Sequence, residues 1–149
     1  MALFIMRLPK TNFGVAARKC KLAGCDGVQI HAAHGFLLTT FLSPHFNKRA
    51  DEYGGPIENR SRLLFEIYDS VRNAVGVDYP IALKLSFSDL VSDSSTPEEM
   101  LWVCKELEKK GIDFIEVSSG ISADNSGASC SPVLRNGDRE GKFLESALL

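Results

Sequence analysis

The feature that most restricts the fold is a pattern that occurs three times, an amphipathic helix followed by a short, mostly apolar strand. Apolar residues recur at helical spacing in each helical stretch. Strands dominated by apolar residues are typical of a parallel sheet that is covered on both faces. The expected pairs are residues 12–23 with 27–30, 56–75 with 81–85, and 96–110 with 114–117. This order predicts an α/β protein with a parallel sheet.

Local signals mark the ends of these helices. Thr96 and Glu99 have the spacing of a capping box, and Pro97 occupies the first helical position. A glycine follows each predicted helix, where a left-handed residue commonly ends one. Residues 121–138 are rich in Ser, Gly and Asn and are predicted to form a loop, and residues 142–149 a further helix.

Two architectures fit this order, an open doubly wound sheet and a (β/α)8 barrel. No glycine-rich phosphate-binding pattern follows a predicted strand, which disfavours a dinucleotide-binding doubly wound sheet. In a barrel, the chemistry lies at the C-terminal ends of the strands. The unusual residues of this chain cluster at or near those ends: His31, His34, Lys84, Ser118 and Ser119. Their placement favours the barrel.

Composition narrows the class of protein. At 149 residues, with 44% hydrophobic and 24% charged residues, the chain is expected to form one globular domain over residues 1–149. A net charge of −2 disfavours a nucleic-acid or anionic membrane partner. No apolar run approaches the ~18 residues of a membrane span, and no secretory signal is expected. The four cysteines form no C-x-x-C pair, so we expect reduced thiols in the cytoplasm, with Cys20 and Cys104 packed on helix faces.

Two histidines, His31 and His34, lie three residues apart directly after the first predicted strand. On a tight turn both rings can face the same way, and two neutral imidazoles can donate hydrogen bonds to one oxygen atom. One alternative is a zinc pair, although no third ligand is evident. Another is a pair of structural histidines bonded to the loop backbone.

Lys84 interrupts the apolar strand at residues 81–85. A lysine is rarely buried without a partner. It therefore either faces solvent at a sheet edge or points toward an anion in a site, and its place in a strand of the buried type favours the second interpretation.

The segment at residues 43–62 carries many charges of both signs and two turn glycines. It could contain a catalytic carboxylate. The preferred interpretation is an ordered long loop in which Arg, Asp and Glu side chains satisfy one another. Trp102, in the third helix, is expected to serve packing.

At these residues the sequence resembles the HAAH subgroup of the old yellow enzyme family, FMN-dependent ene-reductases. The similar stretches are residues 23–38 (AGCDGVQIHAAHGFLL), 41–44, 47, 49–55, 58–60, 82–86, 118–120, 139–140 and 143–145. They span about residues 13–145 and leave residues 1–10 unmatched. The resemblance implies a (β/α)8 TIM barrel, of which this chain supplies about three central units, strands 4 to 6.

The resemblance also implies a chemistry. Family members pass a hydride from NADH or NADPH to FMN and then to an activated alkene, such as an α,β-unsaturated carbonyl. By resemblance, the segment His31-Ala32-Ala33-His34 binds this small-molecule substrate, and the two imidazoles hold its oxygen. Lys84 corresponds to the cation near the flavin N1 and C2 carbonyl.

Two departures from the family accompany this resemblance. Phe36 stands where the family usually has a Tyr that gives a proton to the substrate α-carbon. The chain is also shorter than the ~200 residues of a (β/α)8 barrel, so we expect a partial barrel with open edges and an uncovered apolar face. A non-catalytic remnant unable to hold FMN and a small α/β metal-binding module stay as alternatives, with a homo-oligomer left open.

Overall fold

The computed structural model describes residues 2–120 and 133–135. The helices are α1 (Ala2–Leu22), α2 (Leu37–Leu42), α3 (Ile57–Arg60), α4 (Arg62–Val75) and α5 (Pro97–Lys109), and the strands are β1 (Val28–Ala32), β2 (Ile81–Ser88), β3 (Phe114–Ser119) and β4 (Val133–Arg135). None of the described helices is both long and apolar enough to cross a membrane.

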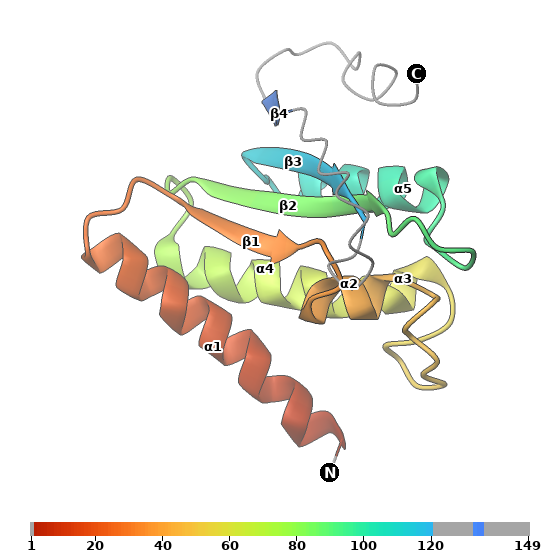
Figure 1. Ribbon diagram of the computed structural model, residues 1–149. Helices are drawn as coiled ribbons and strands as arrows, with labels where there is room; N and C mark the ends of the chain where they lie inside the picture. The colour runs from red at the N-terminus through yellow and green to blue at the C-terminus, as the bar shows by residue number, and fades with distance from the viewer. Residues whose placement is uncertain (1, 121–132, 136–149) are drawn as a thin grey trace.

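The strands form one sheet in the order β1-β2-β3-β4 (Figure 1). β1, β2 and β3 are parallel neighbours, which confirms the predicted α/β fold with a parallel sheet. β4 pairs antiparallel with β3, so the loop predicted over residues 121–138 is wrong at residues 133–135. There, β-prone Val133 lies in a short segment that fills the backbone positions along β3, and this pairing outweighs the turn-rich surroundings. The helix predicted over residues 142–149 lies outside the described residues.

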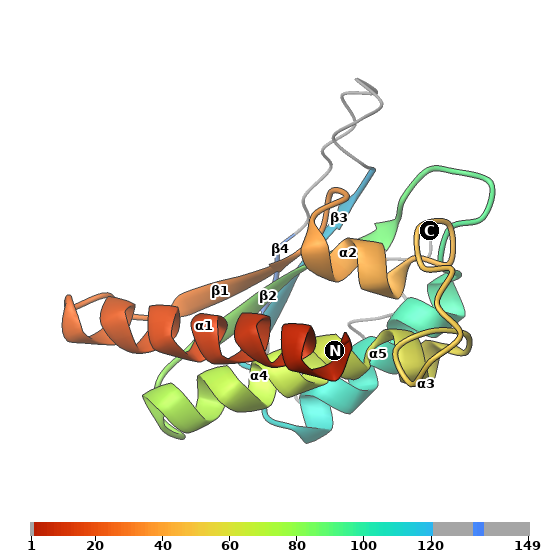
Figure 2. The same ribbon diagram turned by 90° about the horizontal axis from the view of Figure 1, so that it is seen from below.

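Three helices cover one face of the sheet. α1, α4 and α5 run side by side along that face (Figure 2). Within the described residues the opposite face carries no helix. α2 follows the C-terminal end of β1 and precedes the long charged segment (Figure 1). The end of the sheet where β1, β2 and β3 finish is thus the end at which the loops gather.

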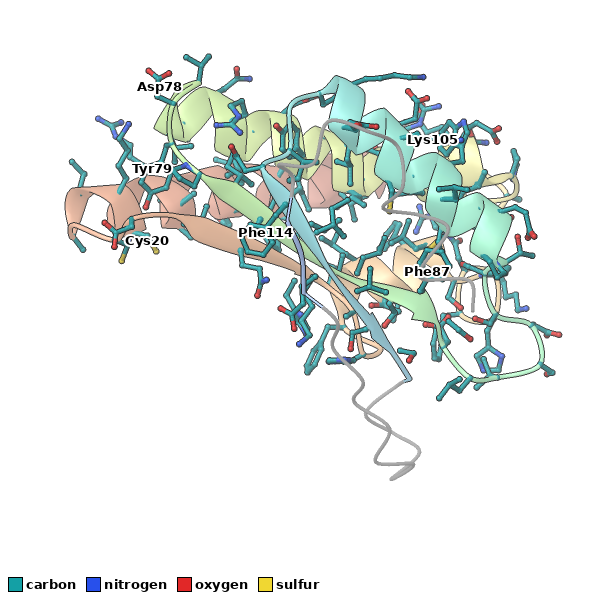
Figure 3. The ribbon with its side chains drawn as sticks, turned by 90° about the horizontal axis from the view of Figure 1, so that it is seen from above. Cys20, Asp78, Tyr79, Phe87, Lys105 and Phe114 are labelled. Carbon is teal, nitrogen blue, oxygen red and sulfur yellow. The ribbon has the colours of Figure 1, made fainter. Side chains whose placement is uncertain are left out.

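The hydrophobic core lies between the sheet and the helices. Residues that alternate along β2 and those on one side of α4 and α5 are fully buried: Ile81, Leu83, Leu85, Leu64, Ile67, Val71, Val103 and Leu107. Burial of one such side chain contributes about 1.5–3 kcal/mol. Cys104 is buried on α5 and Cys20 half-buried on α1, as predicted, and both thiols are free. Figure 3 shows Cys20 at the end of the molecule that also holds Tyr79.

The face of the sheet away from the helices carries both polar and apolar side chains. The exposed large apolar side chains of the described residues lie in helices and loops: Leu8, Val15, Leu22, Phe36, Leu37, Phe46, Val77 and Leu90. On the strands, side chains of alternate residues point to opposite faces. The ones away from the core include polar Gln29, His31, Lys84 and Glu116, together with apolar Ala82 and Phe114. The expected uncovered apolar face is therefore found only in part, because polar residues occupy most of the positions that would line a barrel.

Two helices differ from their predicted bounds. α1 begins at Ala2, well before residue 12, and continues through Pro9. Contacts with α4 stabilise this extension, since Ser70 Oγ donates to the Lys10 carbonyl at 2.8 Å and Lys10 Nζ lies 2.8 Å from Glu66 Oε2. The helix predicted over residues 56–75 is divided into α3 and α4 at Ser61, whose hydroxyl donates to the Ile57 carbonyl at 2.7 Å.

Candidate active site

A row of three polar side chains crosses the uncovered face of the sheet. The β1–β2 register pairs His31 with Lys84, and the β2–β3 register pairs Lys84 with Glu116. Residues at the same level of neighbouring parallel strands point to the same face. All three side chains are half-buried. We call this set the His–Lys–Glu row; it places an imidazole, an ammonium and a carboxylate side by side.

Lys84 faces an anion that belongs to the chain itself. Its Nζ lies 2.7 Å from Glu116 Oε1, and the two side chains are only 20% and 18% exposed. The other carboxylate oxygen, Oε2, accepts a hydrogen bond from Gln29 Nε2 at 2.9 Å. Gln29 reaches β3 across Ala82, its small register partner on β2. The sequence had favoured an anion beside Lys84 without naming it; the available signal was Glu116, the one charged residue in an otherwise apolar strand segment.

His31 and His34 lie close to each other at the end of β1. Their ring centroids are 5.5 Å apart, with an angle of 65° between the ring planes. Burial lowers the pKa of His31 below its usual range, and the neighbouring His34 and Lys84 lower it further, while Glu116 opposes them. The neutral form of His31 is therefore favoured at neutral pH, with one N–H to donate and one nitrogen to accept.

His34 is held from two sides by serines. Its backbone N–H donates to Ser86 Oγ at 3.0 Å, and its Nε2 lies 2.6 Å from Ser118 Oγ. Its φ of 61° is in the left-handed region, which histidine adopts more readily than most residues. The serines come from β2 and β3, where they are register partners. The two strands therefore fix both the backbone and the ring of His34, and its bonds to serine hydroxyls differ from the backbone bonds considered for a structural histidine.

Around the imidazole pair, Phe36 is exposed to solvent, whereas Ala32 and Ala33 are buried. Phe36 is 55% exposed, and its ring centroid lies 5.1 Å from that of His31. Ala32 and Ala33 are fully buried, so their side chains pack behind the imidazoles. The surface offered to a ligand at this end of β1 thus consists of two imidazoles and one phenyl ring.

The prediction that the charged segment at residues 43–62 is ordered by its own Arg, Asp and Glu side chains is confirmed only in part, because Arg60 pairs outside the segment with Glu99 on α5. Arg49 forms an ion pair with Asp51, and the Asn47 side chain donates to the carbonyls of Phe41 and Tyr53, both at 2.7 Å. Trp102 packs against Phe65, with 6.0 Å between ring centroids, in keeping with the packing role expected for it. None of these groups joins the His–Lys–Glu row.

The donor set of the site suits hydrogen bonding better than metal binding. In the described part of the chain, no group of three or more His, Cys, Asp and Glu side chains is arranged to hold a metal ion. What the site offers is the ammonium of Lys84, in the middle of β2, beside two imidazoles at the C-terminal end of β1. Such donors suit a ligand rich in oxygen and nitrogen acceptors.

Comparison with known proteins identifies the family of this chain. A sequence model of the NADH:flavin oxidoreductase / NADH oxidase family matches residues 9–132. The chain belongs to this family. This match confirms the resemblance found in the sequence.

The relatives of this NADH:flavin oxidoreductase family chain are longer proteins. The NADH oxidase of Thermoanaerobacter brockii is 42% identical over 110 residues, which are 74% of this chain and 17% of that enzyme. The NADPH dehydrogenase of Geobacillus thermodenitrificans is 44% identical over 108 residues, 72% of this chain and 31% of that enzyme. The structure of Old Yellow Enzyme from Pichia sp. AKU4542 is 36% identical with a TM-score of 0.70, over 78% of this chain and 33% of that one. The chain thus has the fold of part of a (β/α)8 barrel, as predicted.

Proposed function

We propose that the chain is the part of an FMN-dependent NAD(P)H oxidoreductase that binds the substrate oxygen and faces the flavin pyrimidine ring. The observation that supports this proposal is the placement of Lys84 beside His31 in register, with His34 at the same strand end, in a chain of this family. FMN, when bound, supplies hydride transfer from NADH or NADPH to an activated alkene such as an α,β-unsaturated carbonyl. The substrate proposed is therefore a small molecule.

The residues present fit one edge of a flavin. Lys84 offers a half-buried ammonium that already faces a carboxylate, and a cation in that setting can stabilise negative charge on a reduced isoalloxazine. Lysine supplies a point charge rather than the planar fork of an arginine. Groups for the flavin phosphate are not among the residues identified at this site, so Lys84 is proposed to contact the ring only.

The imidazole pair is proposed to bind and polarise the substrate carbonyl. His31 is held neutral by its surroundings and can donate one N–H to the oxygen. His34 Nε2 already lies against Ser118 Oγ at 2.6 Å, and a hydroxyl can rotate to accept from or donate to a ring nitrogen. Ser118 would thus keep the His34 ring oriented until the substrate oxygen arrives.

Phe36 restricts the second half of the reaction. A phenyl ring has no proton to give, so the proton for the α-carbon is proposed to come from water. The 55% exposure of Phe36 is consistent with solvent access beside His31. Hydride transfer does not depend on this residue, because the imidazoles that hold the oxygen are present.

The state of the cysteines bears on where the protein is located. Three cysteines, Cys20, Cys25 and Cys104, are free thiols in the part of the chain that the structure describes. Free thiols, one of them exposed, are typical of a reducing compartment, and we place the protein in the cytoplasm. A homo-oligomer is proposed as one way to cover the open face of a partial barrel.

The first experiment is an absorbance spectrum of the purified chain after FMN is added and free FMN is removed by desalting. A retained band near ~450 nm supports the proposal, and loss of that band on Lys84→Met would locate the flavin beside the row. No retained flavin would instead favour the non-catalytic remnant. Exposed Lys105→Met is the matched control, since it removes the same charge from α5 (Figure 3).

A further inference from the structure

In the His–Lys–Glu row, Gln29 supports Glu116, and Glu116 in turn pairs with Lys84. Gln29 Nε2 donates to Glu116 Oε2, and the opposite oxygen of that carboxylate lies 2.7 Å from Lys84 Nζ. A lysine side chain has four rotatable bonds and loses conformational entropy when it is fixed. A partner that is itself fixed is therefore needed to hold the ammonium in one place. Glu116 meets this requirement through Gln29, which reaches from β1 to the carboxylate oxygen that Lys84 does not contact.

We propose that Glu116 is a positioning residue, whose carboxylate, fixed by Gln29, holds the Lys84 ammonium at the level of His31 and toward the flavin site. The inference rests on the proposed function, which gives the held cation its use. The register of three strands carries it, because Glu116, Lys84 and His31 occupy one level of β3, β2 and β1. Glu116 acts through Lys84 and is not itself required to touch flavin or substrate.

His31 supplies a reporter of where the ammonium lies. Its pKa is lowered by burial, by His34 and by Lys84, and it is raised by Glu116. Removing Lys84 should therefore raise the pKa of His31, and removing the Glu116 charge should lower it. If Glu116 also positions the ammonium, the effect of Lys84 on His31 must depend on whether Glu116 is present.

The test is a double-mutant cycle on the flavin-free chain. Lys84→Met, Glu116→Gln and the double variant are compared with the parent chain, and the pKa of His31 is measured by NMR titration. We expect the increase caused by Lys84→Met to change clearly in size when Glu116→Gln is present, because the released ammonium then occupies other positions. An equal increase in both backgrounds would overturn the proposal, since Glu116 would then act on His31 only as a separate charge.

A second readout follows Lys84 directly. Acylation of its amine by an amine-reactive ester should become several-fold faster in Glu116→Gln, because the ammonium is released from its partner. If Glu116→Gln does not fold, Gln29→Ala keeps the charges of Lys84 and Glu116 and loosens only the carboxylate. This variant should also speed acylation of Lys84, and an unchanged rate would overturn the proposal. Exposed Glu108→Gln on α5 is the control for the loss of one negative charge and should leave both readouts unchanged.

The two proposals fail in different ways. FMN retention by the parent chain tests the proposed function, whereas the cycle needs no flavin. A parent chain that retains no FMN but shows a non-additive cycle would remove the flavin role and keep the positioning of Lys84. A chain that retains FMN but shows an additive cycle would keep the function and remove the role of Glu116.

Discussion

The guanidinium of Arg60 joins α3 to the first turn of α5 through an ion pair with Glu99. The Arg60 side chain is only 3% exposed, and it also donates to the carbonyls of Leu42 and Gly55. Glu99 closes the capping box of α5 with its other carboxylate oxygen, which accepts from the Thr96 N–H at 3.1 Å. One buried cation therefore ties the end of α2, the charged segment and the start of α5 together.

Arg60→Met should destabilise the chain by about 3 kcal/mol, because the Leu42 carbonyl and Glu99 lose a buried donor. The measurement is the free energy of unfolding from urea denaturation. Arg49→Met is the matched control, since its ion pair with Asp51 is well exposed and should be worth less than about 1 kcal/mol. Equal losses in the two variants would show that the Arg60 network is not a main support of the loop.

Gly14 lies where the backbone of α1 comes close to Ser70 of α4. A Cβ at this position would lie 2.7 Å from Ser70 Oγ and 3.0 Å from the Ser70 carbonyl oxygen. Gly14→Ala should therefore separate the helices and destabilise the chain by about 1–3 kcal/mol, although alanine has the higher helix propensity. Thermal unfolding measures this. Ala16→Ser, at an exposed position of α1, should change stability by a few tenths of a kcal/mol; a stabilised Gly14→Ala would mean that the helices are not packed this closely.

The buried thiol of Cys104 predicts a pH dependence. Burial raises the pKa of Cys104 from 9.0 to about 12, so the folded chain keeps this proton more firmly than the unfolded chain does. Stability should be unaffected by this group below pH 9 and should fall as the pH rises from 9 toward 12, by up to about 1.4 kcal/mol per pH unit. Urea denaturation at several pH values measures the slope. Cys104→Ala should lose this component, and an unchanged slope would assign it to other groups.

Phe36→Tyr should restore a proton donor near the imidazole pair. The ring is exposed and lies 5.1 Å from His31, so an added hydroxyl needs no new space. With FMN bound, we expect reduction of an enone to rise by about 10²-fold where protonation limits turnover, while reduction of the flavin by NADPH keeps its rate. Stopped-flow spectroscopy separates the two half-reactions. Phe46→Tyr, exposed beside His45, is the matched control; equal gains in both variants would argue against a specific role for position 36.

Much of the fold was predictable because local and long-range signals agree. The apolar strand around Leu83 and the capped helix that starts at Thr96 carry their structure in their own residues, and both appear where expected. The start of α1 was not predictable, because Pro9 suggests a boundary, whereas the contact of the neighbouring Lys10 with Ser70 depends on how α4 packs against α1. β4 was missed for a similar reason, since its pairing depends on the position of β3.

The candidate site was predicted in part. His31, His34 and Lys84 were identified from their unusual places after or within strands, and the structure brings all three to one end of the sheet. Glu116 and Ser118 gain their importance from register, which decides that one faces Lys84 and the other faces His34. Strands can be predicted from the sequence more readily than the register in which they pair. The contacts of Glu116 with Lys84 and of Ser118 with His34 could therefore be found only from the structure.

The register of β2 with its neighbouring strands also distinguishes this fold from sheets in which the strands pair one residue out of place. A slip of one residue would turn Lys84 toward the helices and bring Leu83 or Leu85 to the polar face. It would leave the carboxylate of Glu116 without its ammonium and bury an unpaired charge, at a cost of several kcal/mol. The ion pair between Lys84 and Glu116, which is proposed to serve a flavin, thus also favours the correct strand register over shifted ones.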